Sequence, residues 1–451
     1  MLPRLRLRGR LLLSIFILFF IVYILRPYDN PVILLIRWHA SNIRYYYKSS
    51  FYPPGHPHHA ASPLYNISSN DIGHIIKTGY ATKDRLEAKL KAMDERWKSG
   101  NVVIAGDYGS YAERKLNGAM MEVHDVVAGL EKEGFGEGKG GGRMELLRRF
   151  RKATEDPEGI AGSEEILKDG WELDIMKHIP ALELGFKHLL PKKWYLMTDD
   201  DTYIHLPSLT AILSTLDSTR PHYLGNAIGS YTLRFAHGGS GIIFSHSALS
   251  HIFSPHHMRL ITSFKLKSLT ADFGDKIIAE LAMETGIYLN EEYSMHFNGE
   301  SPWKSMIRKE RFCSEVVGFH GMRDGEMDDT AVVLSGVEDK IRWWDLWWDF
   351  GKGNESIEDL GTGLRIGEGR RVRQGWDFVS RVDEHSNVFK IKTEIDCEKA
   401  CDGYKECLSW KWERGKCWVV PWVRVGEKVG DAIVSGVNAK RLAILEKACG
   451  S

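Results

Sequence analysis

Three consecutive carboxylates in the middle of the chain constrain the fold more than any other feature. Residues 199–201 are all aspartates, and the apolar residues 194–197 before them read as a buried strand. Adjacent carboxylates repel one another, and a bound divalent cation removes that penalty because it prefers hard oxygen ligands. Open α/β sheets bind ligands at the carboxyl ends of their strands. The segment therefore predicts such a sheet with a cation at its edge, and a solvated acidic turn is the alternative.

Length and composition indicate a folded protein with more than one domain. The 451 residues suggest one large domain and a smaller one, and a hydrophobic fraction of 43% supplies ample material for a core. The net charge is zero, so there is no basic excess of the kind that indicates a nucleic-acid partner.

The N-terminus carries a basic and apolar targeting signal. Arginines at alternate positions from Arg4 to Arg10 precede the apolar residues 11–25. This run is short for a membrane span of about 17–25 residues, and it also fits a cleaved signal peptide. No small-residue cleavage site follows it, so we favour a cytoplasmic tail at 1–10 and an uncleaved transmembrane signal anchor at 11–26. Because arginines stay on the cytoplasmic side, we expect a single-pass type II protein of the Golgi or ER membrane, with the body of the chain in the lumen.

The sequons and the cysteines agree with a lumenal body. Asn66 and Asn354 each begin an Asn-x-Ser glycosylation sequon. Five of the six cysteines lie after residue 396. Their spacing lacks the paired C-x₂-C knuckles of zinc sites, so disulfides are favoured.

The clustered cysteines predict a small stapled domain within residues 375–451. Two short-range disulfides that join a helix to a small sheet are expected among Cys397, Cys401, Cys407 and Cys417. Cys313 and Cys449 remain. They either pair with each other, which would tie this domain to the rest of the chain, or stay free.

Between these ends, the sequence divides into a stem and a large α/β domain. Residues 27–70 show little periodicity and read as the stem, and residues 71–350 read as the domain. Within it, residues 72–78 and 102–105 read as strands on either side of a helix, and this order implies a parallel sheet.

Two further segments come before the aspartates in the chain. A helix is predicted from about Trp171, with a break or restart at Pro180. The glycine-rich residues 131–143 read as a flexible surface insertion.

Three motifs after the aspartates add candidate functional residues. Gly238 and Gly239 lie in a glycine turn that feeds a strand, where glycine allows a close backbone approach to a ligand or serves a purely structural turn. Asp275 falls in the first turn of a helix, where a cap is the alternative role. His320 ends a short strand, and the tryptophans within 343–348 read as core, as an interdomain contact or as a sugar-stacking platform.

Taken together, these motifs resemble the Fringe-like, core-1 β-1,3-galactosyltransferase group of family 31 glycosyltransferases. The resemblance is strongest to the fungal type with a C-terminal apple (PAN-like) module. The matching segments are 76–79 (IKTG), 170–174 (GWELD), 194–203 (WYLMTDDDTY), 236–241 (AHGGSG), 274–275 (GD) and 319–320 (FH). They cover roughly residues 71–325, and residues 375–425 resemble the module. The chain departs from many relatives in having Gly274 before a single Asp275, and Gly321 after His320.

The resemblance implies an α/β fold of the GT-A type with a mixed central sheet, followed by a small disulfide-bonded α+β module. It implies a UDP-sugar donor and Mn²⁺, with Mg²⁺ as the alternative. It assigns Asp275 as the general base. The implied metal ligands are Asp199, Asp201 and His320. The implied nucleotide-sugar contacts are Lys77, Thr78, Asp107, Asp199, Asp200, Gly238 and Gly239. By analogy with apple modules, it also pairs Cys397 with Cys417 and Cys401 with Cys407.

The expected activity is inverting transfer of a hexose, with galactose favoured, to a glycan or glycoprotein acceptor through a β-1,3 linkage. One rival is a non-catalytic, membrane-anchored carbohydrate-binding or adhesion protein. In such a protein the apple module would bind a glycan or protein ligand. Such a protein would not need the aspartates or His320. A metal-dependent hydrolase or phosphotransferase is the second rival, and it would want more ligands for a second metal.

Overall fold

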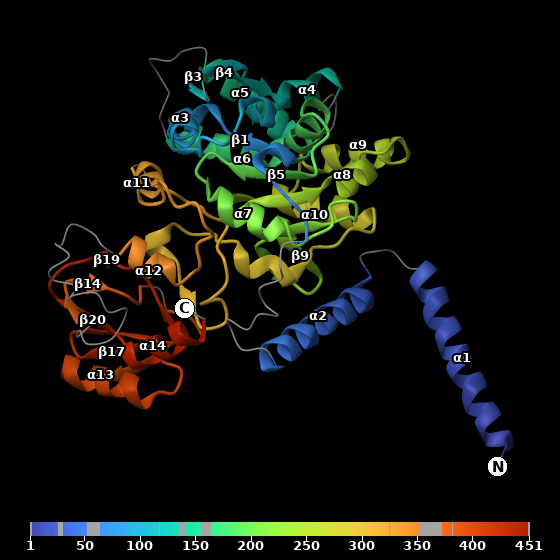
Figure 1. Ribbon diagram of the computed structural model, residues 1–451. Helices are drawn as coiled ribbons and strands as arrows, with labels where there is room; N and C mark the ends of the chain where they lie inside the picture. The colour runs from blue at the N-terminus through green and yellow to red at the C-terminus, as the bar shows by residue number, and fades with distance from the viewer. Residues whose placement is uncertain are drawn as a thin grey trace.

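The computed structural model describes residues 2–25, 30–51, 64–116, 118–134, 141–154, 164–323, 325–351, 372–380 and 382–449. Figure 1 shows three parts: two N-terminal helices, a large α/β part, and a smaller C-terminal part coloured orange and red.

A seven-stranded mixed sheet forms the centre of the large part, as the sequence predicts. Its order is β3-β4-β2-β1-β5-β10-β7. The strands β4, β2, β1 and β5 are parallel, whereas β3 and β10 run antiparallel to their neighbours. The strands are β1 (Ile72–Lys77), β2 (Val102–Gly106), β3 (Ser110–Leu116), β4 (Ala119–Asp125), β5 (Trp194–Asp199), β7 (Tyr223–Gly225) and β10 (Ile242–Ser245).

Alternation along the strands explains the layers on both faces of this sheet. Ile75 belongs to one hydrophobic core and the next residue, Ile76, to the other. The first face is covered by α4 (Val126–Lys132), α5 (Gly141–Thr154), α6 (Glu164–His188), α8 (His246–Ile252), α9 (Met258–Lys267) and α10 (Gly274–Glu284). The second face is covered by α3 (Lys83–Ala92), which links β1 to β2, and by α7 (Leu206–Leu213). The predicted strand–helix–strand unit is therefore confirmed.

Small ribbons and short helices complete the large part. They are β6 (Tyr203–Ile204), β8 (Ala227–Ser230), β9 (Leu233–Ala236), β11 (Ile307–Arg308), β12 (Gly318–Phe319), α11 (Glu326–Val333) and α12 (Asp345–Asp349). The pairing of β12 with β6 brings the segment after residue 317 back beside the aspartates.

Two helix boundaries differ from the prediction. α6 begins at Glu164 and continues through Pro180 without a break. Ile179 and Ala181 are both buried in the first core, so packing on either side of the proline outweighs the backbone hydrogen bond that it removes. Both ends of the predicted glycine-rich insertion are helical, because α4 ends at Lys132 and α5 begins at Gly141. Residues 135–140 lie outside the described residues.

The C-terminal part is an α+β unit built on a five-stranded antiparallel sheet. The strand order is β13-β20-β16-β17-β15. The elements are β13 (Val372–Gln374), β14 (Trp376–Asp377), β15 (Asn387–Lys390), α13 (Glu394–Gly403), β16 (Ser409–Glu413), β17 (Lys416–Val420), β18 (Trp422–Val423), β19 (Glu427–Lys428), β20 (Ile433–Val437) and α14 (Ala439–Ala448).

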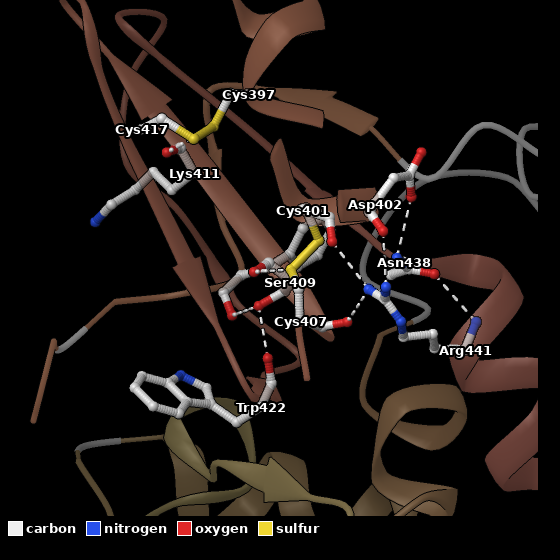
Figure 2. Close-up of a disulfide and its surroundings, with 11 residues drawn as sticks. Cys397, Cys401, Asp402, Cys407, Ser409, Lys411, Cys417, Trp422, Asn438 and Arg441 are labelled. Atoms are coloured by element: carbon white, nitrogen blue, oxygen red, sulfur yellow. Dashed lines mark hydrogen bonds between the residues drawn. A yellow bond between two sulfur atoms is a disulfide. The ribbon is translucent and has the colours of Figure 1, made fainter. Parts of the chain in front are cut away.

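Both short-range disulfides expected in this unit are present. Cys397 pairs with Cys417 and Cys401 with Cys407, which staples α13 to the sheet (Figure 2). The Arg441 guanidinium on α14 donates hydrogen bonds to the carbonyls of Cys401 and Cys407 at 2.9 and 3.0 Å. The close-up therefore shows α14 held against the smaller disulfide loop.

A shared core joins the C-terminal unit to the large part, and we call this region the seam. It contains the buried Trp343, Trp344 and Trp347 together with Phe378 and Val423 of the C-terminal unit. β11 pairs with β18 across it. The third disulfide, Cys313–Cys449, closes it, which settles the open alternative for these two cysteines. The tryptophans are thus core at an interdomain contact.

The N-terminal segment contains two helices, α1 (Leu2–Leu25) and α2 (Pro31–Phe51). In α1, the apolar side chains described between Leu11 and Ile21 are exposed. The sequence predicts an aperiodic stem where α2 lies, and the structure differs because α2 packs on the large part. Leu34 is buried, and the Arg37 guanidinium lies 3.5 Å from the Tyr288 ring centroid. Within the portion of the chain that is described, no helix is sufficiently long and apolar to cross a membrane.

Candidate active site

The predicted site residues meet at the carboxyl edge of the sheet. Lys77 ends β1 and lies opposite Asp199, which ends β5. Asp107 follows β2 directly, and the backbone N–H of Thr78 donates to the carbonyl of Ala105 at 2.9 Å. Three neighbouring parallel strands therefore deliver their terminal side chains to one place, as their register requires.

Asp199, Asp201 and His320 form a cluster that can hold a metal ion. One donor atom from each residue lies within 4.8 Å of the others. His320 Nε2 is 3.3 Å from Asp201 Oδ1, and this oxygen is buried without a hydrogen bond. An unpaired buried carboxylate oxygen is unfavourable, and a cation would satisfy it. Carboxylate oxygens suit Mn²⁺ and Mg²⁺, so the residues fit a divalent cation of the predicted kind.

The turn between β9 and β10 makes room for the imidazole of His320. A Cβ atom on Gly239 would lie 2.0 Å from His320 Nε2, so glycine is required for the imidazole to fit. Thr202 Oγ1 donates to the Gly239 carbonyl at 2.7 Å, and the His237 ring meets the His320 ring edge-on. The glycine turn therefore has a structural role in the site, and its contact with substrate stays a prediction.

Lys77 is fully engaged within the protein. Its Nζ lies 2.8 Å from Asp174 Oδ2, 2.8 Å from Asp199 Oδ1 and 3.1 Å from His178 Nε2. Burial alone would lower the pKa of Lys77, but Asp174 and Asp199 outweigh it and hold the pKa above its ordinary value. Burial likewise favours a neutral Asp199, but Lys77 outweighs it and lowers the pKa of this carboxyl. Lys77 thus keeps Asp199, a candidate metal ligand, ionised, and the predicted contact of Lys77 with the nucleotide remains a prediction.

The middle aspartate points away from the metal cluster. Asp200 Oδ2 accepts hydrogen bonds from Thr78 Oγ1 at 2.8 Å and Thr82 Oγ1 at 2.6 Å. Burial, and then the neighbouring Asp201, raise the pKa of Asp200 to about 7. Thr78 therefore supports the acidic loop from within, and the predicted nucleotide-sugar contacts of Thr78 and Asp200 are not tested by this arrangement.

A second lysine fixes the backbone beneath the aspartates. Lys89 Nζ donates to the carbonyls of Asp199 at 2.6 Å and Thr202 at 2.9 Å, and to Thr198 Oγ1 at 2.6 Å. Burial lowers the pKa of Lys89 to about 8. Its position on α3 thereby determines the shape of the loop that carries the metal ligands.

Asp107 is buried and both its carboxylate oxygens have protein partners. Oδ2 lies 3.1 Å from Lys177 Nζ, and Oδ1 accepts from the backbone N–H of Tyr80 at 2.9 Å. Lys177 Nζ also donates to the Thr78 carbonyl at 2.8 Å. Asp107 is therefore part of the support of the β1 end, and its contact with the nucleotide stays a prediction.

Asp275 lies in the first turn of α10, half-buried beside the glycine turn. Its Oδ2 accepts from the backbone N–H of Gly238 at 3.0 Å, and its Oδ1 from the backbone N–H of Lys276 at 2.8 Å. Both contacts orient the carboxylate toward the same edge as the metal cluster. These contacts fit both a helix cap and a proton acceptor, so its role as the general base stays a prediction.

Sequence reasoning missed the contribution of α6 to this site. Asp174, Lys177 and His178 are all buried or half-buried on α6, and they connect Lys77, Asp107 and Gly274. The available signal was three polar residues, Asp174, Lys177 and His178, at i, i+3 and i+4 among apolar neighbours shortly before Pro180. Such a group on a buried helix face needs partners, and the strand ends supply them.

The two predicted glycosylation sites have different outcomes. The Asn66 side chain is exposed, which is compatible with modification. Asn354 lies outside the described residues.

A mixed α/β sheet with an aspartate cluster at its carboxyl edge is the architecture of a GT-A glycosyltransferase domain. Residues 177–296 match the family model described as Fringe-like. This match supports a glycosyltransferase domain of the Fringe-like family 31 type within the chain, and enzymes of that family use UDP-sugar donors. The matched segment contains the three aspartates, the glycine turn and Asp275, and it ends before His320.

Proposed function

We propose that the protein is an inverting, metal-dependent glycosyltransferase that moves a hexose from a UDP-sugar to a glycan or glycoprotein hydroxyl. Galactose is the favoured sugar, and a β-1,3 linkage the favoured product. One observation carries the proposal: a cation-binding cluster and a separately held carboxylate, Asp275, lie at the same edge of the sheet. Inverting transfer needs these two functions, one for the leaving group and one for the acceptor proton.

Different residues of the chain would serve the leaving group and the acceptor proton. Asp199, Asp201 and His320 would hold Mn²⁺, which when bound supplies the positive charge that stabilises a diphosphate leaving group. Lys77 keeps Asp199 ionised and oriented for this role. The bond from the anomeric carbon to the diphosphate breaks while the acceptor oxygen bonds to that carbon, and the acceptor proton passes to Asp275.

The environment of Asp275 suits late proton transfer. Two backbone N–H groups donate to its carboxylate and fix its orientation, and a carboxylate is intrinsically a weak base. A weak base suffices when the acceptor hydroxyl becomes acidic only as the new bond forms.

A donor screen tests the proposal. The full chain with Mn²⁺ is incubated with UDP-galactose, UDP-glucose, UDP-GlcNAc and UDP-GalNAc, and sugar transfer and donor hydrolysis are measured. We expect one donor to be used, chelation to abolish the reaction and Mn²⁺ to restore it. Full activity in excess chelator would reject the metal assignment, and no reaction with any donor would favour a binding or adhesion protein.

Two substitutions separate the metal site from the base. Asp201→Ala should lose donor binding and rate together. Asp275→Asn keeps the shape and one of the two accepting oxygens but cannot take the proton, so transfer should fall about 10²–10⁴-fold while UDP and Mn²⁺ affinity persist. Asp272→Asn is the matched control because Asp272 is exposed in the preceding loop. Near wild-type transfer by Asp275→Asn would reduce Asp275 to a helix cap.

We also propose that the N-terminus attaches the protein to Golgi or ER membranes with the transferase part in the lumen. The arginines before the apolar residues of α1, and the exposure of those residues, support this proposal. Protease treatment of sealed microsomes should leave the C-terminus intact until detergent is added. Digestion without detergent would reject this topology, and secretion with an N-terminus beyond residue 26 would indicate a cleaved signal.

A further inference from the structure

The imidazole of His178 lies between the two halves of the candidate active site. Its Nε2 is 3.1 Å from Lys77 Nζ, and its Nδ1 is 3.0 Å from the carbonyl of Asp174. An ammonium group only donates, so Nε2 is the acceptor, and Nδ1–H donates to the carbonyl. The partners therefore assign one neutral tautomer, and burial, then Lys77, lower the pKa of His178, which agrees with it.

The other side of the ring packs against the backbone that holds Asp275. A Cβ atom on Gly274 would lie 2.1 Å from His178 Nδ1, so the imidazole occupies the space of a side chain at this position. A Cβ atom on Gly238 would lie 3.4 Å from His178 Nε2 and 3.4 Å from the Asp275 Cβ. Gly274 precedes Asp275 in the chain, and Gly238 donates its N–H to the Asp275 carboxylate.

We propose that His178 is a positioning residue that sets the spacing between the metal ligands and the base. It acts on Asp199 through Lys77, and on Asp275 through the backbones of Gly238 and Gly274. The proposal rests on the proposed function, because it assigns His178 to the same reaction. Misplacing reacting groups by about 1 Å can lower a rate about 10²-fold, so a rigid spacer of this kind is significant.

This role needs two properties of the ring, its bulk and its hydrogen-bond acceptor for Lys77, and substitutions separate them. His178→Leu retains bulk but removes the acceptor for Lys77. His178→Gln retains an acceptor on a more flexible side chain. His178→Ala removes both. His188→Leu is the control on the same helix, because His188 is exposed beyond Pro180 and away from the strand ends that form the site.

The kinetic experiment measures kcat, donor KM and Mn²⁺ affinity for the full chain. We expect His178→Ala to lower kcat about 10²-fold, with a smaller change in donor KM, and His178→Gln to recover part of that loss. His178→Leu should weaken Mn²⁺ binding about tenfold, since removing a group that supports a metal ligand typically costs 10–100-fold. The proposal is overturned if His178→Ala and His178→Leu stay within twofold of wild type, as His188→Leu should.

A double-mutant cycle tests the spacing by unfolding, without reference to activity. Gly274→Ala should strongly destabilise the wild-type protein because its methyl group meets the imidazole. In the His178→Ala background the same change should cost little, since the space is then empty. Equal effects of Gly274→Ala in both backgrounds would overturn the proposal.

These measurements keep the two proposals distinguishable. A wild-type protein that transfers no sugar from any donor refutes the proposed function, and the unfolding cycle and the Mn²⁺ affinity of His178→Leu still decide the role of His178. An active wild-type protein with unaffected His178 variants refutes the spacer alone.

Discussion

The carboxyl edge of the sheet and the seam differ in the side chains that they bury: charged groups at the edge and large apolar groups at the seam. The edge contains buried charged groups, and Asp201 Oδ1 there has no hydrogen-bond partner. The seam contains the large side chains of Trp343, Trp344 and Trp347, a strand pair and a disulfide. Both are buried, but one concentrates charge and the other removes apolar surface from water.

This difference indicates that the seam stabilises the fold and that the carboxyl edge destabilises it. The seam makes the C-terminal unit part of the structural core of the molecule, although the sequence reads it as a separate module. The edge keeps like charges close and leaves polar atoms unsatisfied, an arrangement that a bound cation would relieve. Substitutions should therefore destabilise the seam, whereas removal of a charge at the edge should stabilise the protein while impairing its function.

Truncation at residue 350 should have the largest effect on stability. It leaves the predicted α/β domain but exposes Trp343, Trp344 and Trp347, and it removes the partner of Cys313. We expect little soluble protein and no cooperative unfolding, measured by size-exclusion chromatography and near-UV circular dichroism beside the full chain. A soluble fragment with a sharp transition would show that the seam is dispensable.

Removal of the disulfide across the seam should come next. Cys313 and Cys449 are 136 residues apart, so Cys313→Ser with Cys449→Ser should cost about 5 kcal/mol of unfolding free energy in the loop-entropy model. The bridge between Cys401 and Cys407, with a separation of 6, should cost only about 2 kcal/mol when removed. Denaturant titrations of the two variants, each lacking one disulfide, measure which loss of unfolding free energy is larger. A larger loss for the bridge between Cys401 and Cys407 would contradict this account.

Asp200→Asn at the acidic edge should change stability in the opposite direction. The pKa of Asp200 is about 7 when folded and near 4 when unfolded, so the folded state binds this proton more tightly and loses stability as pH rises from about 4 to 7. The Asn variant avoids that loss and can still accept from Thr78 and Thr82. In chelator it should exceed wild type by up to about 4 kcal/mol at pH 8, and match it below pH 4. Equal stability of the variant and the wild type at pH 8 would mean that the Asp200 carboxylate is more solvated than its buried position indicates.

The ion pair at the rim of the seam should have the smallest effect. Lys309 Nζ lies 2.7 Å from Glu406 Oε1, and both side chains are about half exposed. Water screens such pairs, so Lys309→Ala should change the unfolding free energy by less than about 1 kcal/mol. A larger loss in a thermal melt would mean that charge, and not apolar burial, holds the seam together.

The sequence determined much of this protein by itself. The aspartate cluster at the end of an apolar strand indicated the sheet and its functional edge, because the type of residue and its place on a strand follow from local pattern. The resemblance to family 31 glycosyltransferases implied Asp199, Asp201 and His320 as a set, and the structure brings them together. The cysteine spacing likewise predicted the two short-range disulfides, which the structure contains.

Only the tertiary structure decided how these parts are supported and joined. The pairing of Cys313 with Cys449, the packing of α2 on the large part and the continuation of α6 through Pro180 all depend on contacts between segments far apart in the chain. The position of His178 beside Gly274 is the clearest case. The polar residues of α6 indicate that His178 needs a partner, and the GD motif marks Gly274, but nothing in the sequence connects the two. The imidazole fills the space of a missing side chain 96 positions away, and such packing is defined only when the chain has folded.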